Sequence, residues 1–344
     1  MKLIFYSPQF YPSIGGLQNV VKDWALALHQ AGWQVTVICS TSSSEPEPFP
    51  FTVLRNAPFW VQVKEMRSSN YVLMFNVSLK ALPQVILSGR PLIINHQTSL
   101  YETGRKEPLR QWLKKMVAYR LAVLNVACSK NIAATYRHSA VISNPYNNAL
   151  FINQHQRRSG HFLFVGRLVT DKGVDILLDA FRQVLQQTQQ PYNLTIVGLG
   201  PELERLQQQA AAAGISDRVH FSGALLGENL VDAINRHQIM IVPSRVEPFG
   251  IVVLEGLACG CRVIASNAGG LPEAAGGFAR LFAAGDSRQL ATAMQQEMEA
   301  SDAPSPTLAP YLEQHSVAAT ARQLMALVTG IPTKTKVNNH VGHQ

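Results

Sequence analysis

Charge and cysteine are both scarce in this sequence, and no apolar run is long. Charged residues make up 15% of its 344 residues, and only four residues are cysteine. Nothing approaches the ~18 consecutive apolar residues that indicate a membrane-spanning helix. The opening segment, MKLIFYSPQF, also has too short an apolar run for a signal peptide. We therefore expect a cytoplasmic protein.

The few cysteines are also too dispersed for a structural zinc site. Cys39 and Cys128 stand alone in apolar runs, whereas Cys259 and Cys261 share one short segment. A structural zinc ion normally takes four ligands in paired spacing, and packing as a small apolar side chain is the commoner role of free cysteine. No cluster of carboxylates suggests another bound metal. The sequence predicts buried cysteines, no metal site and no cofactor.

The composition is that of a folded chain with a preference for anionic partners. Hydrophobic residues make up 47%, and 344 residues suggest two domains with separate cores. The 30 basic and 22 acidic residues give a net charge of +8. This excess suits phosphorylated small molecules, an acidic membrane surface or nucleic acid. No nucleic-acid-binding module or aromatic-interleaved basic run is present, so nucleic acid is not expected.

Short apolar strands alternate with amphipathic helices along most of the chain. This alternation is typical of parallel sheets that are covered on both faces, and it restarts after a polar stretch. We therefore predict two Rossmann-like α/β domains whose strand ends face each other across a cleft. The predicted parts are a first domain, a linker, a second domain, a terminal helix and a disordered tail, at 1–150, 151–160, 161–310, 311–330 and 331–344.

Two short patterns lie where strands end in this arrangement. Gly15 and Gly16 begin the first helix, where glycine lets a phosphate approach free backbone N–H groups; alternatively, they form an ordinary turn. They do not form G-x-G-x-x-G, which argues against a dinucleotide cofactor. Arg167 and Lys172 follow the first strand of the second domain and suit a diphosphate. A solvated basic turn is the alternative.

Two glutamates, Glu247 and Glu255, bracket an otherwise apolar segment, RVEPFGIVVLE. Pro248 disfavours helix at the residue before it, which places Glu247 in the loop between a strand and a helix. Glu255 then lies one turn into that helix. A carboxylate accepts hydrogen bonds well from sugar hydroxyls. The two glutamates and the free N–H groups at the start of the helix between them therefore suit a ligand with hydroxyls at both ends and a phosphate between. A helix cap followed by an ordinary helical glutamate is the alternative.

The stretch 105–120 combines a basic face with an apolar stripe. It suits an interfacial helix on anionic lipid. The interpretation we favour is a core-facing helix with a solvated basic face, and the sequence leaves the lipid interpretation open.

Several blocks together resemble one enzyme family over nearly the whole length. The most specific block is PSRVEPFGIVVLEGLACGCRVIASNAGGLPE, and others are YPSIGGLQNVVKDWALALHQAGWQVTVICS, VGRLVTDKGVDILLDAF, LTIVGLGPELERL and VHFSG. The chain resembles the retaining glycosyltransferases of family 4, the group 1 glycosyl transferases, which have the GT-B fold. The resemblance implies an N-terminal acceptor-binding domain and a C-terminal nucleotide-sugar-binding domain.

The family's E-x7-E motif matches Glu247 and Glu255. By this resemblance Glu255 would hold the donor ribose, and Glu247 would hold hydroxyls of the transferred hexose. Gly250 and Ile251 would meet sugar or phosphate through their backbone N–H groups, and Phe249 belongs to the same donor-binding segment.

Four further residues match by the same resemblance. Arg167 and Lys172 correspond to the diphosphate-binding pair, and Gly16 to the glycine-loop contact. His96, at the end of PLIINH, corresponds to a histidine near the reacting carbon. The chain departs from the family at Asn76, where many members have histidine, and over 41–90.

The resemblance implies metal-independent transfer of a hexose from a nucleoside-diphosphate sugar to an acceptor hydroxyl, with retention. The expected acceptor is a cell-envelope or lipid-linked glycan. The alternatives are a sugar-nucleotide epimerase of the same fold and a non-catalytic nucleotide-sugar-binding protein. The donor base does not follow from the sequence.

Overall fold

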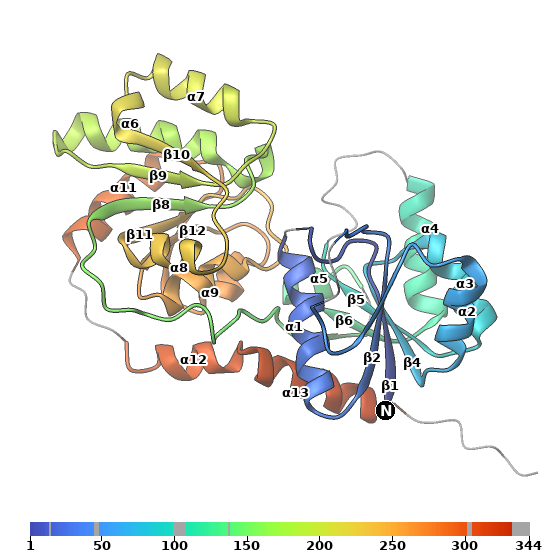
Figure 1. The fold of residues 1–344 in the computed structure, drawn as a ribbon. Helices are drawn as coiled ribbons and strands as arrows, with labels where there is room; N and C mark the ends of the chain where they lie inside the picture. The colour runs from blue at the N-terminus through green and yellow to red at the C-terminus, as the bar shows by residue number, and fades with distance from the viewer. Residues whose placement is uncertain (14, 45–47, 99–107, 137, 301–304, 332–344) are drawn as a thin grey trace, which may run out of the picture.

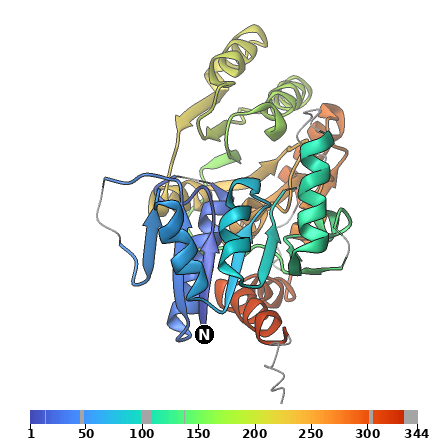
Figure 2. The same cartoon turned by 90° about the vertical axis from the view of Figure 1, so that its right-hand side faces the viewer.

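A computed structural model gives the fold of the chain, and Figures 1 and 2 show it from two sides. It describes residues 1–13, 15–44, 48–98, 108–136, 138–300 and 305–331. The predicted tail lies outside the described residues from residue 332 on, and the basic stretch 105–120 is described from residue 108 on. In the described parts no helix has both the length and the apolar character needed to cross a bilayer.

The N-terminal domain is built on a parallel sheet with helices on both faces. In the described residues its strand order is β3 (Thr52–Arg55), β2 (Gln34–Cys39), β1 (Lys2–Tyr6), β4 (Tyr71–Phe75), β5 (Leu92–His96), β6 (Ala122–Ala127) and β7 (Ser139–Val141). One face is covered by α1 (Gly16–Gln30). The other is covered by α2 (Phe59–Arg67), η1 (Leu79–Ala81), α3 (Leu82–Ser88), α4 (Pro108–Arg120) and α5 (Lys130–Ala133).

A second parallel sheet forms the C-terminal domain. Its described strands run in the order β10 (Val219–Gly223), β9 (Leu194–Val197), β8 (Gly160–Val165), β11 (His237–Val242), β12 (Arg262–Ser266) and β13 (Ala279–Phe282). One face packs against α6 (Val174–Thr188), α7 (Leu203–Ala212) and α11 (Ser287–Glu299). The other packs against α8 (Gly227–Asn235), α9 (Ile251–Ala258) and α10 (Leu271–Ala275). In Figure 1 the arrows of β8, β9 and β10 point toward the N-terminal domain.

The end of the described chain returns to the N-terminal domain. The segment expected to form one helix over 311–330 instead forms α12 (Leu308–Gln314) and α13 (Val317–Thr329). The break arises because the Ser316 hydroxyl accepts a hydrogen bond from the Ala319 N–H and thereby caps a new helix. The second helix lies beside α1, where the buried Trp24 indole donates to Thr320 Oγ1 at 3.0 Å.

The two domains share part of their hydrophobic core. One cluster of buried side chains continues from the α2–α5 side of the first sheet to the α8–α10 side of the second. The four cysteines are buried, as expected, and none of them forms a disulfide. An edge strand at Thr52–Arg55, which the sequence did not indicate, completes the first sheet.

Candidate functional site

The predicted cations and carboxylates follow two neighbouring strands at one edge of the C-terminal sheet. Arg167 lies two residues after the end of β8, and Glu247 follows β11. The strand order reverses between these two strands, because the chain winds outward from β8 in one direction and from β11 in the other. Open parallel sheets bind ligands beside the carboxyl ends of the strands at such a reversal. The expected site therefore lies at the position that the topology favours.

Lys172 and Glu247 form an ion pair at this edge. The Lys172 Nζ donates to Glu247 Oε2 at 2.6 Å, and Ser244 Oγ donates to the same oxygen at 3.3 Å. Lys172 ends the short helix η2 (Thr170–Lys172), only five residues beyond Arg167. An ammonium group has three N–H bonds, so Lys172 can hold the carboxylate and still donate to a phosphate. The Arg167 side chain is exposed.

Glycines fix the loop that carries Glu247. The backbone of Gly250 has φ +101°, and a Cβ there would collide with Leu271. The Gly270 N–H donates to the Glu247 carbonyl oxygen at 2.8 Å. A Cβ on Gly269, whose φ is +54°, would collide with that same oxygen. The AGGLP part of the motif therefore supports the Glu247 backbone from behind, a role that the sequence did not indicate.

Glu255 lies on the second turn of α9, as expected. Burial, together with a smaller effect of the negative charge of Asp23, raises its pKa from the usual 4.5 to about 7. No hydrogen bond from the described residues offsets these effects. The first backbone N–H groups of α9, near Ile251, have no acceptor within the helix. This edge of the sheet thus offers hydrogen-bond acceptors, free backbone N–H donors and positive charge.

The side chain of Phe249 is in the core rather than at the site. It is 1% exposed and stacks on His315, with ring centroids 6.0 Å apart. Any contact with a ligand would therefore come from the Phe249 backbone.

The N-terminal domain meets this edge at two places. At the start of α1, a Cβ on Gly16 would lie 3.7 Å from Ile251 Cδ1, so α1 begins against the beginning of α9. Ser129 Oγ donates to the Pro248 carbonyl oxygen at 2.7 Å and also accepts from the Ile132 N–H as the cap of α5. The second contact joins the Glu247 loop to the end of β6. It was not predicted, because Ser129 has no local sequence signal.

His96 lies deeper than its expected role suggests. Its ring is fully buried, stacks on Tyr136 and bonds through Nε2 to Asn125 Oδ1 at 2.9 Å. The Asn125 amide nitrogen donates to the Ala118 carbonyl oxygen, so Asn125 Oδ1 is an acceptor and His96 Nε2 carries the proton. Burial lowers the pKa of His96 to about 4, which leaves a neutral ring whose Nδ1 has no hydrogen-bond partner in the described chain. Its place beside the reacting carbon stays a prediction.

Asn76, where the chain departs from the family, has a structural role. Its φ of +57° turns the chain after β4, and its Oδ1 accepts from the Gln97 N–H at 2.7 Å.

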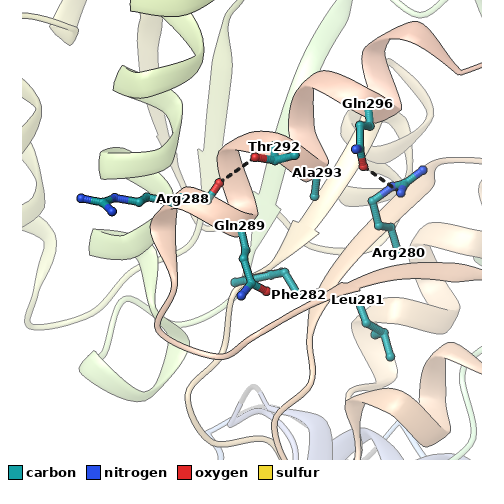
Figure 3. Close-up of a pocket in the computed structure, with 8 residues that line it drawn as sticks. All are labelled: Arg280, Leu281, Phe282, Arg288, Gln289, Thr292, Ala293 and Gln296. Carbon is teal, nitrogen blue, oxygen red and sulfur yellow. Dashed lines mark hydrogen bonds between the residues drawn. The ribbon is translucent and has the colours of Figure 1, made fainter.

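Two hollows in the described residues lie away from this edge. One, of about 300 Å³, is formed by β13 and α11, with Arg280 bonded to Gln296 on one side and Arg288 pointing away (Figure 3). The other, of about 390 Å³, lies between the end of α4 and β6. Within the described residues, no three His, Cys, Asp or Glu side chains gather closely enough to hold a metal ion.

Comparison with known proteins identifies the family. The family described as glycosyl transferases group 1 matches residues 147–305. A protein of Methanocaldococcus jannaschii, described as an uncharacterized glycosyltransferase, is 32% identical over 291 residues, which cover 77% of this chain and 78% of that protein. The chain belongs to the group 1 glycosyl transferases. The region of this group 1 glycosyltransferase that matches the family contains β8 to α11. It therefore includes the domain in which Lys172 and Glu247 form their ion pair.

The fold of this group 1 glycosyltransferase is GT-B, as expected. The crystal structure of HepE of Anabaena in complex with UDP and glucose superposes on this chain with a TM-score of 0.79. The two proteins are 23% identical, and the superposition covers 96% of this chain and 99% of HepE. The D-inositol 3-phosphate glycosyltransferase of Corynebacterium jeikeium is 43% identical over 120 residues, which cover 33% of this chain and 29% of that protein. The match thus spans less than a third of that relative's length.

Proposed function

We propose that this protein transfers a hexose from a nucleoside-diphosphate sugar to an acceptor hydroxyl, with retention at the anomeric carbon. The observation that carries the proposal is the Lys172–Glu247 ion pair at the β8/β11 reversal. It puts a cation suited to a diphosphate in direct contact with a carboxylate suited to the sugar next to that diphosphate. HepE, which shares the fold, is described in complex with UDP and glucose.

The cations act on the leaving group in this proposal. As the bond between hexose and diphosphate breaks, negative charge gathers on the diphosphate. Lys172, Arg167 and the N-terminal end of α1 at Gly16 would stabilise that charge, because all three present positive charge or free N–H groups. Such preorganised donors are worth most when they oppose charge that develops in the transition state.

The carboxylates hold sugars rather than forming a covalent bond. Glu247 would accept from hexose hydroxyls, and Glu255 from the ribose. The acceptor would react on the face of the sugar that the diphosphate leaves, with the leaving phosphate helping to remove the acceptor proton. His96 would approach the reacting carbon only if the residues that cover its ring shift, because the ring is fully buried.

The acceptor in this proposal is a cell-envelope or lipid-linked glycan, and the protein acts in the cytoplasm at the inner face of the cell membrane. The basic stretch 105–120 supports this location: its described part, α4, carries an exposed Leu109 and an exposed Trp112 among its basic residues.

The test is a panel of UDP-, GDP- and ADP-sugars, scored by thermal stabilisation and by slow hydrolysis of the donor. We expect one nucleotide class to stabilise the protein and to release its sugar with the anomeric configuration retained, as seen by NMR. An epimerase would convert the donor with no acceptor, so nucleoside-diphosphate release that depends on an acceptor argues against it. Donor binding without turnover on any envelope glycan would favour a non-catalytic binder.

Removing divalent metal should leave the activity intact. Arg167 and Lys172 already supply positive charge to the diphosphate, so no metal is needed for that purpose. Because both cations stay in place when the metal is chelated, we expect the initial rate in EDTA to stay within about two-fold of the untreated rate. Abolition by EDTA with rescue by Mg²⁺ or Mn²⁺ would contradict this expectation.

Glu255→Gln should weaken binding of both the donor and the free nucleoside diphosphate, because both carry the ribose.

The same variant should be more stable than the parent above pH 7. Because the pKa of Glu255 is higher in the folded protein than in the unfolded chain, ionisation of this group lowers the free energy of unfolding. This loss of stability grows as the pH rises from 4.5, the ordinary pKa, to about 7, the raised pKa. Its Tm should therefore match the parent near pH 4.5 and exceed it by a few degrees at pH 8. Equal Tm values at both pH values would show that Glu255 is solvated.

A further inference from the structure

Three helices on one side of the N-terminal sheet expose large apolar side chains. Figure 2 looks onto α2, α3 and α4, which lie side by side on that face. Their inner sides pack in the core, yet Trp60 on α2 is 69% exposed and Trp112 on α4 is 55% exposed. Further exposed apolar residues on these helices are Val61, Ile86, Leu87, Leu109 and Leu113. We refer to the outer side of α2, α3 and α4 as the three-helix face.

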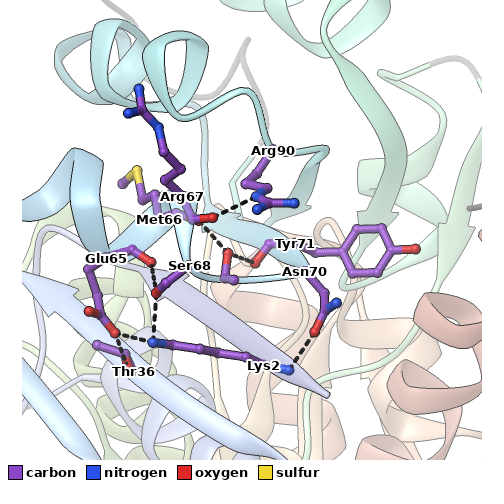
Figure 4. A network of polar contacts seen from close by, with 10 residues as sticks. Lys2, Thr36, Glu65, Met66, Arg67, Ser68, Asn70, Tyr71 and Arg90 are labelled. Carbon is purple, nitrogen blue, oxygen red and sulfur yellow. Dashed lines mark hydrogen bonds and ion pairs between the residues drawn. The ribbon is translucent and has the colours of Figure 1, made fainter. Parts of the chain in front are cut away.

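The segments that form the three-helix face have a large excess of basic residues. Residues 59–90 and 108–120 contain eight basic residues and one acidic residue, Glu65. Glu65 is already neutralised, because Lys2 Nζ lies 2.6 Å from its Oε1 and Thr36 donates to the same oxygen (Figure 4). Arg67 and Arg90 bond to the carbonyl oxygens of Leu87 and Arg67, which carry no net charge. The cations at this end of the face are therefore not compensated by acids of these two segments.

We propose that the three-helix face docks on an anionic lipid bilayer, with Trp60 and Trp112 as its two anchors. Tryptophan combines a large apolar body with one polar N–H, which suits the boundary between headgroups and acyl chains. Cations around such anchors are attracted to anionic headgroups. The exposed residues come from three neighbouring helices rather than from the walls of a groove, so the face suits a broad, flat partner. A protein partner would need its own continuous acidic and apolar surface.

The docked orientation would bring the reactive edge close to the bilayer. β3 ends at Arg55 and α2 begins at Phe59, so Trp60 lies near the carboxyl edge of the sheet. Trp112 is in the second turn of α4, whose beginning likewise follows the carboxyl end of β5. That same edge meets the Glu247 loop through Ser129. This inference rests on the proposed function for its purpose: the headgroup of a lipid-linked acceptor would enter where donor and acceptor meet.

The experiment is co-sedimentation of the full chain with phosphatidylcholine vesicles, with and without phosphatidylglycerol. We expect binding only to the anionic vesicles, and release at high salt. Trp60→Ala with Trp112→Ala should lower the partition coefficient roughly ten-fold, because anchoring scales with the apolar area inserted. Lys64→Glu with Lys80→Glu should lower it about five-fold for each unit of charge changed.

Matched controls come from the C-terminal domain. Leu199→Ala with Leu226→Ala removes comparably exposed apolar residues, and Arg182→Glu with Arg288→Glu reverses two exposed charges; both should bind vesicles like the parent. Thermal stabilisation by the nucleoside diphosphate should be unchanged in the tryptophan and lysine variants, so failure of docking is distinguishable from failure of the proposed activity. Equal binding to both vesicle types, or equal losses in the controls, would overturn the proposal. A dimer that the tryptophan variant dissociates would instead make the face an interface between two copies.

Discussion

Lys172→Ala should lower kcat/KM for the preferred sugar donor by about 10²–10³-fold. This is the range found when one preorganised hydrogen-bond donor to the developing charge is removed. Two effects combine in this variant. The variant lacks the cation that would stabilise the negative charge on the departing diphosphate. Glu247 also loses its ion-pair partner, because Lys172 Nζ lies 2.6 Å from Glu247 Oε2. The measurement is steady-state kinetics with the donor identified by the nucleotide panel, together with the affinity for the free nucleoside diphosphate.

The structural part of this loss can be separated from the electrostatic part. Glu247 is only 8% exposed, so Lys172→Ala leaves a nearly buried carboxylate that keeps the hydrogen bond from Ser244, and the variant should have a lower Tm. Lys172→Gln keeps a hydrogen-bond donor for Glu247 but removes the charge. We expect Lys172→Gln to recover most of the lost Tm and little of the lost activity.

Arg167→Ala is the cleaner test of the diphosphate site. The Arg167 side chain is exposed, so its removal should leave Tm unchanged while it weakens both donor binding and turnover. Arg182→Ala, on the outer side of α6, is the matched control for loss of an exposed arginine. Normal kcat/KM in Arg167→Ala would remove this residue from the donor site.

Much of the fold was predictable because buried parallel strands appear in the sequence as continuous apolar runs. Tyr71–Phe75 is buried at every position, and its uninterrupted run of apolar residues is the pattern that indicates such a strand. Thr52–Arg55 was missed because this edge strand has four residues and none of them is fully buried. The break between α12 and α13 was missed because Ser316 lies within a pattern that otherwise continues as a helix.

The site divides in the same way between local and distant signals. The loop position of Glu247 followed from Pro248 and the next apolar run, which are adjacent in sequence. Its ion pair with Lys172 joins residues 75 positions apart, and no local pattern encodes that distance. The same limit applies to the bond between Ser129 and Pro248 and to the complete burial of His96. Sequence located the strand ends, whereas packing decided which side chains meet there.

Glu247→Gln should lower kcat and kcat/KM by the same factor, about 10²-fold or more, while affinity for the free nucleoside diphosphate stays nearly unchanged. The glutamine has the shape of the glutamate, and its Oε1 can still accept from Lys172. What it loses is the negative charge that holds the transferred hexose. An interaction that is strongest in the transition state gives this matched loss, because ground-state binding is not affected.

The stability of the loop distinguishes this result from a structural role. The Glu247 backbone is held by Gly270 and by close packing at Gly269 and Gly250, none of which depends on the charge of the side chain. Tm should therefore change little in Glu247→Gln. Gly269→Ala is the comparison for a disturbed loop, because its Cβ would collide with the Glu247 carbonyl oxygen, and it should lower Tm and activity together. If Glu247→Gln instead lowered Tm or nucleotide affinity at unchanged kcat, the carboxylate would be a structural partner of Lys172 and not a ligand of the hexose.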